Sequence, residues 1–208
     1  MRMPEVVHER SIEFSFAFMN VGNPPATVLD IGCSESDFPI VLAAQGFKVF
    51  GIDIRECYIK DPSYTFMKRD IMNTHFPNNF FDVITAISTI EHLGVQGRYG
   101  IKEDAPLADN VAMKEIKRII KRDGRFIMTV PYGKLAVFRP WHKVYDEDAL
   151  KELINDFSVL REEYFIRKAN GCWIQTTRRV ASQITPYVTA KSGIVLDYQH
   201  ALACLVLR

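Results

Sequence analysis

The stretch from Thr27 to Ser36 constrains the fold of this chain more than any other segment. Its sequence, Thr-Val-Leu-Asp-Ile-Gly-Cys-Ser-Glu-Ser, predicts a buried strand that runs into a tight turn of small residues. A helix is expected over residues 37–45, and the strand 49–53 then ends in a carboxylate, about 20 residues after the turn. This order of strand, turn, helix, strand and acid is typical of sites that bind a nucleoside-containing cofactor.

The composition favours one globular domain. The chain has 208 residues, of which 48% are hydrophobic, and this supports a single sizeable core. With 26 basic and 25 acidic residues the formal net charge is +1, so nothing favours non-specific binding to nucleic acid or to a membrane surface. We therefore expect one domain over 1–208, with an N-terminal helix and connector (1–26), a cofactor-binding core (27–157) and C-terminal strands (158–208).

The cysteines favour a cytoplasmic protein. They lie scattered along the sequence at Cys33, Cys57, Cys172 and Cys204. No pair has the spacing of a zinc site or of a disulfide framework, and free thiols suit a reducing compartment. The first ten residues lack the pattern of a secretory signal, and no apolar run approaches the roughly 18 residues that cross a bilayer.

Strands and helices are expected to alternate along the chain. The patterns predict helices over 6–19, 106–122 and 146–155, and further strands over 65–69, 81–87, 125–130, 158–166 and 201–207. Such alternation predicts an α/β fold, a doubly wound, mostly parallel seven-stranded sheet whose last strand is antiparallel, with helices on both faces as an α-β-α sandwich. Residues 132–145 are expected to form a long loop, and residues 169–198 are ambiguous. On the first helix, Arg10 and Glu13 are possible ligand contacts, although solvated charges are the favoured interpretation.

Right-handed crossovers place the carboxyl ends of parallel strands on one edge of the sheet, where ligands bind. The segments expected at that edge are Asp30–Ser36, Asp53, Asp70, Ser88–His92 and Pro131–Gly133. The chemically versatile side chains of the chain thus follow strand ends, and we expect them to form the functional site.

The turn argues against a dinucleotide as the cofactor. A dinucleotide site needs a G-x-G-x-x-G run, but here Gly32 is followed by Ser34 and Ser36. Asp30 at the end of the first strand would repel a pyrophosphate, whereas it suits a cofactor that carries an ammonium group. S-adenosylmethionine has such a group, no phosphate, and a ribose diol for a second acid such as Asp53.

The motifs together resemble those of class I S-adenosylmethionine-dependent methyltransferases. The segments that carry the resemblance are Val28–Cys33, Val49–Asp53, Arg69–Ile71, Phe81–His92, Gly124–Pro131 and His142–Leu153, in the order and spacing of that family. The resemblance covers about residues 27–157. The sequence departs from the family in the turn, where two of the three usual glycines are Ser34 and Ser36.

The resemblance implies a set of cofactor-binding residues. They are Asp30, Gly32, Cys33, Ser34, Asp53, Ile54, Asp70, Ile71 and Ser88. Within this set Asp53 is expected to hold the ribose hydroxyls, and Asp70 and Ile71 to flank the adenine. The serine hydroxyls are candidates to bond the cofactor carboxylate, and Cys33 is expected to fill space rather than to act as a nucleophile.

Two histidines are the candidate catalytic residues. His92 follows the fourth strand and is either the base that removes a proton from an oxygen acceptor or an orienting group. His142 is the second candidate, with a hydrogen bond that ties down its loop as the favoured role. Glu91, His92 and His142 do not have a recognised ligand spacing, so no metal is expected.

The methyl acceptor is expected to be a small polar molecule, with Tyr99, Tyr132 and Trp141 as candidate contacts. A thinner likeness to saccharide-decorating methyltransferases, in Ile90–Gly94, Gly97–Gly100 and Val130–Lys134, favours an O-methyltransferase acting on a sugar or glycoconjugate. No nucleic-acid or membrane partner is favoured, and the chain is expected to be a monomer or homodimer, with residues 169–198 covering the pocket or forming a dimer contact.

Three other functions stay open at this stage. One is a methyltransferase that acts on RNA or protein, and another is a non-catalytic S-adenosylmethionine-binding regulator, which the serines in the turn keep open. A nicotinamide-dependent oxidoreductase is disfavoured, because the turn lacks G-x-G-x-x-G and no Tyr-x-x-x-Lys pair stands where a short-chain dehydrogenase needs one.

Overall fold

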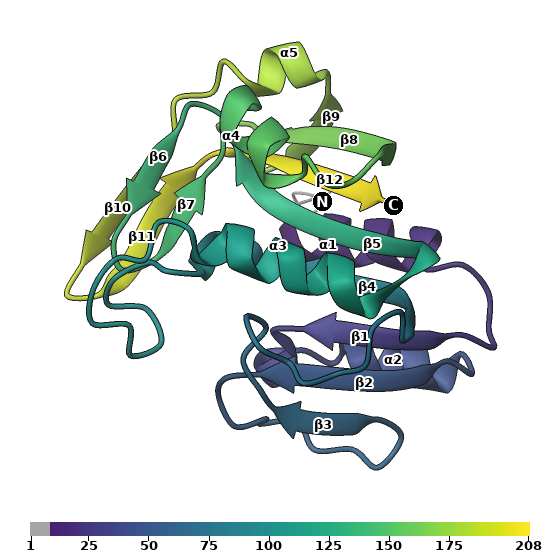
Figure 1. Cartoon of the computed structure of the whole chain (residues 1–208). Helices are drawn as coiled ribbons and strands as arrows, with labels where there is room; N and C mark the ends of the chain where they lie inside the picture. Colours follow the sequence, from purple (N-terminus) through teal and green to yellow (C-terminus); the bar gives the residue numbers. More distant parts are fainter. Residues whose placement is uncertain (1–8) are drawn as a thin grey trace, which may run out of the picture.

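A central eight-stranded sheet organises the computed structural model, which describes residues 9–208 (Figure 1). Its strands are β1 (Thr27–Ile31), β2 (Lys48–Asp53), β3 (Thr65–Lys68), β4 (Phe81–Ile87), β5 (Ile120–Tyr132), β8 (Val159–Arg167), β9 (Trp173–Thr176) and β12 (Ala201–Leu207). They lie in the order β3-β2-β1-β4-β5-β12-β8-β9. The first five strands are parallel, and β12 runs antiparallel to both of its neighbours. The α/β fold with its mostly parallel sheet is confirmed, but the sheet has one strand more than predicted, because β9 folds back on β8.

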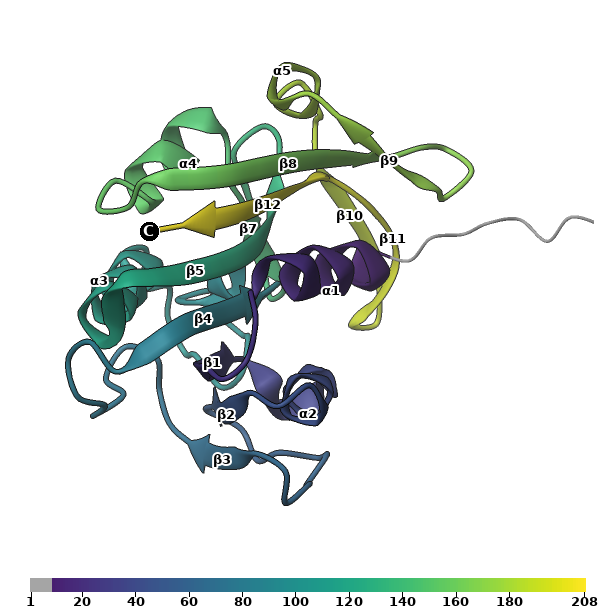
Figure 2. The ribbon, with the colours of Figure 1, turned by 90° about the vertical axis from the view of Figure 1, so that its right-hand side faces the viewer.

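Helices cover both faces of the sheet (Figure 2). Helices α1 (Glu9–Asn20) and α2 (Phe38–Ala44) lie on one face, and α3 (Ala108–Ile119) and α4 (Glu147–Leu153) lie on the other. The short helix α5 (Arg178–Ala181) follows β9, and the connections through residues 54–64 and 69–80 contain no helix. Among residues 9–208, no helix combines the length and apolarity needed to span a membrane.

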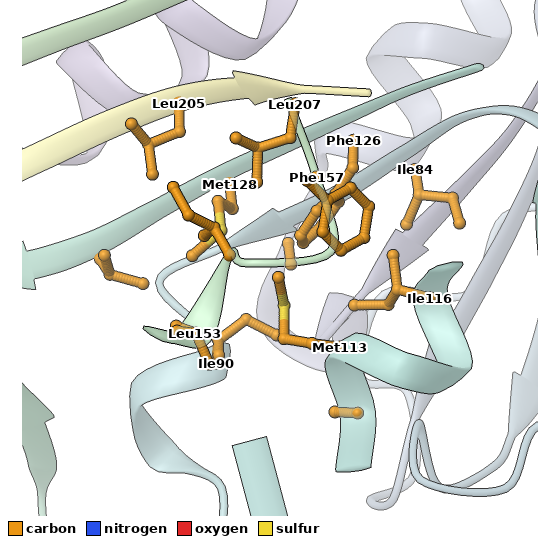
Figure 3. Close-up of a cluster of buried hydrophobic side chains, with 14 of the residues drawn as sticks. Ile84, Ile90, Met113, Ile116, Phe126, Met128, Leu153, Phe157, Leu205 and Leu207 are labelled. Carbon is orange, nitrogen blue, oxygen red and sulfur yellow. The ribbon is translucent and has the colours of Figure 1, made fainter. Parts of the chain in front are cut away.

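The strand β12 shows how the sheet serves two cores. Leu202, Cys204 and Val206 pack toward α1 and α2, whereas Leu205 and Leu207 point to the opposite face. Figure 3 shows that opposite face, where side chains from β5, β12, α3 and α4 meet. A strand buried on both faces reads as a near-continuous apolar run, which is why this element was predictable from sequence.

The boundaries of α3 and β5 differ from the prediction. The helix ends at Ile119 rather than near residue 122, because Ile120 already pairs with Phe81 of β4. Gly124 has no positive φ and therefore does not cap the helix. The strand also continues through Pro131, whose carbonyl accepts a hydrogen bond from the Tyr145 backbone amide at 3.1 Å. Proline removes a donor from the strand but leaves this acceptor in place.

Two hairpins replace the predicted loop and the ambiguous segment. Residues 132–145 contain β6 (Ala136–Phe138) and β7 (His142–Val144), and residues 169–198 contain most of β10 (Tyr187–Lys191) and β11 (Ile194–Gln199). Both hairpins lie at the edge of the sheet where the parallel strands end (left in Figure 1). They therefore extend the edge at which the functional side chains were expected. Asp146 caps the start of α4, since its side chain accepts from the Ala149 amide.

Candidate active site

Three cavities meet at the carboxyl edge of β1, β2 and β4. The apolar cavity, of about 90 Å³, is lined by residues that include Ile52, Asp53, Ile54, Ile71, Leu93 and Ile101. The charged cavity, of about 350 Å³, is lined by Arg10, Asp30, Glu35, Asp37, Arg55 and Arg98 among others. The histidine cavity, of about 280 Å³, includes Glu9, Glu91, Trp141, His142, Tyr198 and His200 in its wall. Ser88 and His92 line all three cavities, so together these form one groove.

Gly32 shapes the turn where the apolar and charged cavities join. Its φ of +82° lies in the left-handed region, which favours glycine. A Cβ at this position would also collide with the side chain of Thr89. Its amide donates to the carbonyl of Ile52 at 2.8 Å and fixes the turn against β2. Glycine is thus required here for both backbone conformation and space.

The serines of the turn stabilise the protein itself. Cys33–Glu35 form a turn of 3-10 helix, and the Ser34 side chain is fully buried and donates to the carbonyl of Glu56 at 2.7 Å. The Ser36 hydroxyl accepts from the amide of Phe38, the first residue of α2, at 3.1 Å. The Ser34 hydroxyl is therefore not available to a cofactor carboxylate, contrary to the expectation. Cys33 is also fully buried, burial raises the pKa of its thiol, and neither residue lines a cavity.

The carboxylate of Asp53 is occupied by Arg55. Its Oδ1 accepts from the Arg55 backbone amide at 2.9 Å and from Nε at 3.1 Å, and its Oδ2 accepts from Nη2 at 3.0 Å. The Ser34 amide also donates to Oδ2, at 3.1 Å. The Asp53 side chain is 4% exposed, whereas that of Arg55 is 25% exposed and lines both the apolar and the charged cavity. Arg55 thus lies where a ligand that spans the two cavities would reach Asp53.

The ring of Tyr99 lies between two guanidinium groups. Those of Arg55 and Arg98 each lie 4.4 Å from its ring centroid, and Arg98 also donates to the Tyr99 hydroxyl. Tyr99 adopts a positive φ of 50° and borders the apolar and charged cavities. Tyr99 was predicted to contact the methyl acceptor. It lies beside the groove, but it does not line the histidine cavity.

Of the two residues predicted to flank an adenine, Ile71 lines the apolar cavity and Asp70 does not. Ile54 and Ile71 line the apolar cavity. Asp70 does not line it, because its Oδ1 accepts from the Met72 backbone amide at 2.8 Å and closes a turn. The preceding residue, Arg69, lines the cavity instead.

Asp30 provides a buried carboxyl group in the charged cavity. It is 3% exposed and accepts from the Thr85 hydroxyl at 2.6 Å. Burial raises its pKa to about 7, while the Thr85 hydrogen bond and the positive charge of Arg10 oppose the shift. A cationic ligand group beside Asp30 would favour the carboxylate and would be bound by it.

Glu13 lies in the interior, which corrects the expectation that it is a solvated charge. Its side chain is 1% exposed, forms an ion pair with Arg10 at 3.1 Å and accepts from the Thr129 hydroxyl at 2.7 Å. It also accepts from the hydroxyl of Ser88, whose φ is +44°. Glu13 therefore holds Ser88, a wall residue of all three cavities, in a strained conformation.

His92 has one ring nitrogen fixed and the other free. Its Nδ1 lies 2.6 Å from the carbonyl oxygen of Trp141, which can only accept, so Nδ1 carries the hydrogen. The other nitrogen, Nε2, is 3.8 Å from Glu91 Oε1, too far for a hydrogen bond. Burial, aided by the positive charge of Arg98, lowers the pKa of His92 to about 4. The ring is therefore neutral near pH 7, with the lone pair of Nε2 unshared.

Three histidine rings lie next to one another around the histidine cavity. The ring centroid of His142 is 6.4 Å from that of His92 and 5.5 Å from that of His200. His142 Nε2 is buried without a partner, and burial lowers the pKa of this residue to about 3. His142 was expected to tie its loop down by a hydrogen bond. That bond comes instead from His92, which contacts the carbonyl of Trp141 just before β7. Within residues 9–208, no group of three or more histidine, cysteine or acidic side chains is arranged to hold a metal ion.

Sequence reasoning missed His200 and Glu9. His200 Nε2 lies 2.9 Å from Glu9 Oε1 in the wall of the histidine cavity, although 191 residues separate the two in sequence. No local pattern signals such a pair. Trp141 lines this cavity as predicted, but Tyr132 does not, because its side chain points to the other face of the sheet and packs against Tyr164 at 5.0 Å.

The groove fits S-adenosylmethionine. The apolar side chains of Ile52, Ile54 and Ile71 suit an adenine ring, and Asp53 at the same cavity suits ribose hydroxyls once Arg55 has moved. Asp30 in the adjoining cavity suits an ammonium group. The histidine cavity then remains for a second molecule beside the cofactor.

Comparisons with known proteins agree with this site. A sequence profile described as a methyltransferase domain matches residues 8–164. No curated protein matches the sequence.

Solved structures share the fold at low sequence identity. The PH0226 protein of Pyrococcus horikoshii is 18% identical with a TM-score of 0.61, over 98% of this chain and 93% of that one. The [4+2]-cyclase SpnF is 18% identical with a TM-score of 0.59, over 74% of this chain and 59% of that one. The 1,6-didemethyltoxoflavin-N1-methyltransferase of Burkholderia thailandensis, solved with S-adenosylhomocysteine, is 17% identical with a TM-score of 0.56, over 93% and 76%. The domain match, the fold and the groove agree, and the chain belongs to the class I S-adenosylmethionine-dependent methyltransferases.

Proposed function

We propose that this methyltransferase transfers its methyl group to a hydroxyl of a small polar molecule, such as a sugar or glycoconjugate, with His92 as the base. The observation that carries the proposal is the free Nε2 of His92 at the junction of the three cavities. An oxygen acceptor loses a proton on methylation, and a neutral imidazole with an unshared lone pair can take it.

The environment of His92 supports this role. Bound S-adenosylmethionine supplies an electrophilic methyl group. An acceptor oxygen that gains the methyl becomes strongly acidic, so even a base with a pKa of about 4 can take its proton. The carbonyl of Trp141 keeps the hydrogen on Nδ1 and stabilises the imidazolium that forms at His92.

The size and lining of the histidine cavity favour a small acceptor. Its volume of about 280 Å³ lies just below the range for drug-sized ligands, roughly 300–1,000 Å³. Two valines of the β10–β11 hairpin, Val188 and Val195, line it, so the hairpin forms part of its wall. A cavity of this size favours a small acceptor over RNA or a protein, the main alternative.

The histidines also weigh against a non-catalytic cofactor-binding protein. A regulator would need the apolar and charged cavities, but not a base that faces an adjoining third cavity. The free cysteines favour the cytoplasm as the site of action, and a monomer suffices because this chain supplies the whole groove.

Methyl-transfer assays with monosaccharides, phenols, amines, peptides and RNA test the proposal. We expect transfer to a hydroxyl acceptor, measured as S-adenosylhomocysteine release. His92→Ala should lower turnover at least 100-fold, in the range of general base catalysis, with unchanged affinity for S-adenosylhomocysteine. Transfer only to amines or macromolecules, or full turnover by the variant, would disprove the role assigned to His92.

A further inference from the structure

The histidine cavity gathers most of the buried polar atoms that lack a partner. Within residues 9–208 there are five such side-chain atoms, and four belong to residues that line this cavity, namely Glu91 Oε2, Arg98 Nε, His142 Nε2 and His200 Nδ1. The fifth, the hydroxyl of Tyr132, lies elsewhere. Unsatisfied buried polar atoms destabilise a folded protein, so a cluster of them around one cavity indicates that a ligand supplies the missing partners.

Glu9 holds one side of the His200 ring through a hydrogen bond to Nε2. The Glu9 carboxylate accepts from His200 Nε2 at 2.9 Å and from the Tyr198 hydroxyl at 3.0 Å. Burial acts to raise the pKa of Glu9, but the His200 and Tyr198 contacts prevail and lower it, so Glu9 stays ionised. Nε2 is engaged by this carboxylate, so Nδ1 is the ring nitrogen that is left without a partner. A hydroxyl group of a ligand, which can either donate or accept, supplies the missing partner.

His200 is distinct from His92 in its position. His92 borders the two cavities that fit the cofactor, whereas His200 lines only the histidine cavity and is 5% exposed. His200 thus contacts the acceptor away from the reacting centre. The other partnerless atoms need a ligand that can accept hydrogen bonds as well as donate them. The Nε–H of Arg98, for example, can only donate and therefore needs an acceptor. A hydroxyl group both donates and accepts, and several hydroxyls on one molecule satisfy the cluster.

The aromatic wall agrees with a ring-shaped ligand. The Tyr198 ring stacks on His200 with centroids 5.2 Å apart, and Trp173 packs against the same histidine at 5.9 Å. Tyr198 and Trp141 line the cavity, so aromatic side chains lie beside its polar groups. Aromatic and polar groups side by side suit a ring that carries hydroxyls.

We propose that the Glu9–His200 pair binds a second hydroxyl of the methyl acceptor, so that the acceptor is a cyclic diol or polyol rather than a molecule with one hydroxyl. The inference rests on the proposed O-methyl transfer, and His200 acts in it as a specificity-determining residue. One hydrogen bond to a buried ring nitrogen such as His200 Nδ1 contributes about 1.4 kcal/mol, which corresponds to a tenfold difference in affinity.

The test compares trans-1,2-cyclohexanediol with cyclohexanol, which differ by one hydroxyl on the same ring. Both are titrated into protein saturated with S-adenosylhomocysteine, and calorimetry measures the two dissociation constants. We expect the wild-type protein to prefer the diol about tenfold. His200→Gln keeps a donor for Glu9 but has no polar atom at the Nδ1 position, so this preference should fall to nearly one.

His200→Asn is the matched variant, because its amide places a polar atom at the Nδ1 position. It should retain more of the diol preference than His200→Gln. Unchanged affinity for S-adenosylhomocysteine and a near wild-type melting temperature show that each variant is folded. Equal affinities for diol and mono-ol in the wild-type protein, including no detectable binding of either, or an undiminished preference in His200→Gln, would overturn the proposal. Because this readout is binding, it is separate from the methyl-transfer assay, whose failure would instead refute the role of His92.

Discussion

Replacing Arg55 by methionine should tighten cofactor binding. The Arg55 guanidinium occupies both oxygens of Asp53, at 3.0–3.1 Å, and the side chain lines both the apolar and the charged cavity. A ligand whose ribose hydroxyls bind Asp53 must first break the contacts from the guanidinium. In the variant that step is absent, and the buried carboxylate gains more from the hydroxyls because it lacks its positive partner.

The structure sets the expected size of the effect. Hydrogen bonds to a charged group contribute about 1.5–3 kcal/mol. The Arg55 side chain is 25% exposed, so solvent screening places the value near the lower end, about 1.5 kcal/mol. We therefore expect Arg55→Met to lower the dissociation constant for S-adenosylhomocysteine about tenfold.

Isothermal calorimetry measures this constant, and thermal unfolding supplies a second readout. The ligand-free variant should melt below the wild-type protein, because Asp53 loses an ion-pair partner, and its melting temperature should rise further on saturation. Lys121→Met is a control with the same change in charge, since its ion pair with Asp82 at 2.6 Å lies outside the groove. Weaker binding by Arg55→Met would show that Arg55 contacts the cofactor instead of competing with it.

Three further predictions concern the turn and the titrating groups. Asp30 has a pKa of about 7 and must be ionised to bind an ammonium group. The affinity for S-adenosylhomocysteine should therefore fall up to tenfold per pH unit as the pH drops from 7 to 5.5. Asp30→Asn should remove this pH dependence. If His92 is the base, kcat/KM for the acceptor, measured at saturating cofactor at each pH, should stay flat down to about pH 5 and fall only near the His92 pKa of about 4. A midpoint near 6.5 would contradict the assigned environment. Gly32→Ala should weaken cofactor binding at least tenfold, whereas Gly100→Ala, with a similar φ of +84° but open space around it, should not; equal effects would mean that the contact with Thr89 is unimportant.

The central strands were predictable because their burial dictates their sequence. β1, β2 and β4 lie inside the sheet, so each reads as an apolar run with a carboxylate or small residue at its end. The positions of Asp30, Gly32 and Asp53 follow directly from where those strands end. This is why the cofactor end of the groove could be derived before the structure was known.

The acceptor end was not predictable, for a physical reason. The β6–β7 and β10–β11 hairpins are short ribbons at the surface, and no buried face imposes an alternating pattern on them. The pairing of Glu9 with His200 joins the first described helix to the turn before the last strand. Such a contact depends on the folded sheet, so the sequence near either residue carries no signal for it.

The most direct test of the account is a crystal structure with S-adenosylhomocysteine. We expect the ribose hydroxyls at Asp53 with Arg55 displaced, the ammonium group at Asp30, and the sulfur directed toward the histidine cavity with His92 Nε2 beside that path. A sulfur atom directed away from His92, or an Arg55–Asp53 pair that stays intact beside the bound ligand, would contradict it.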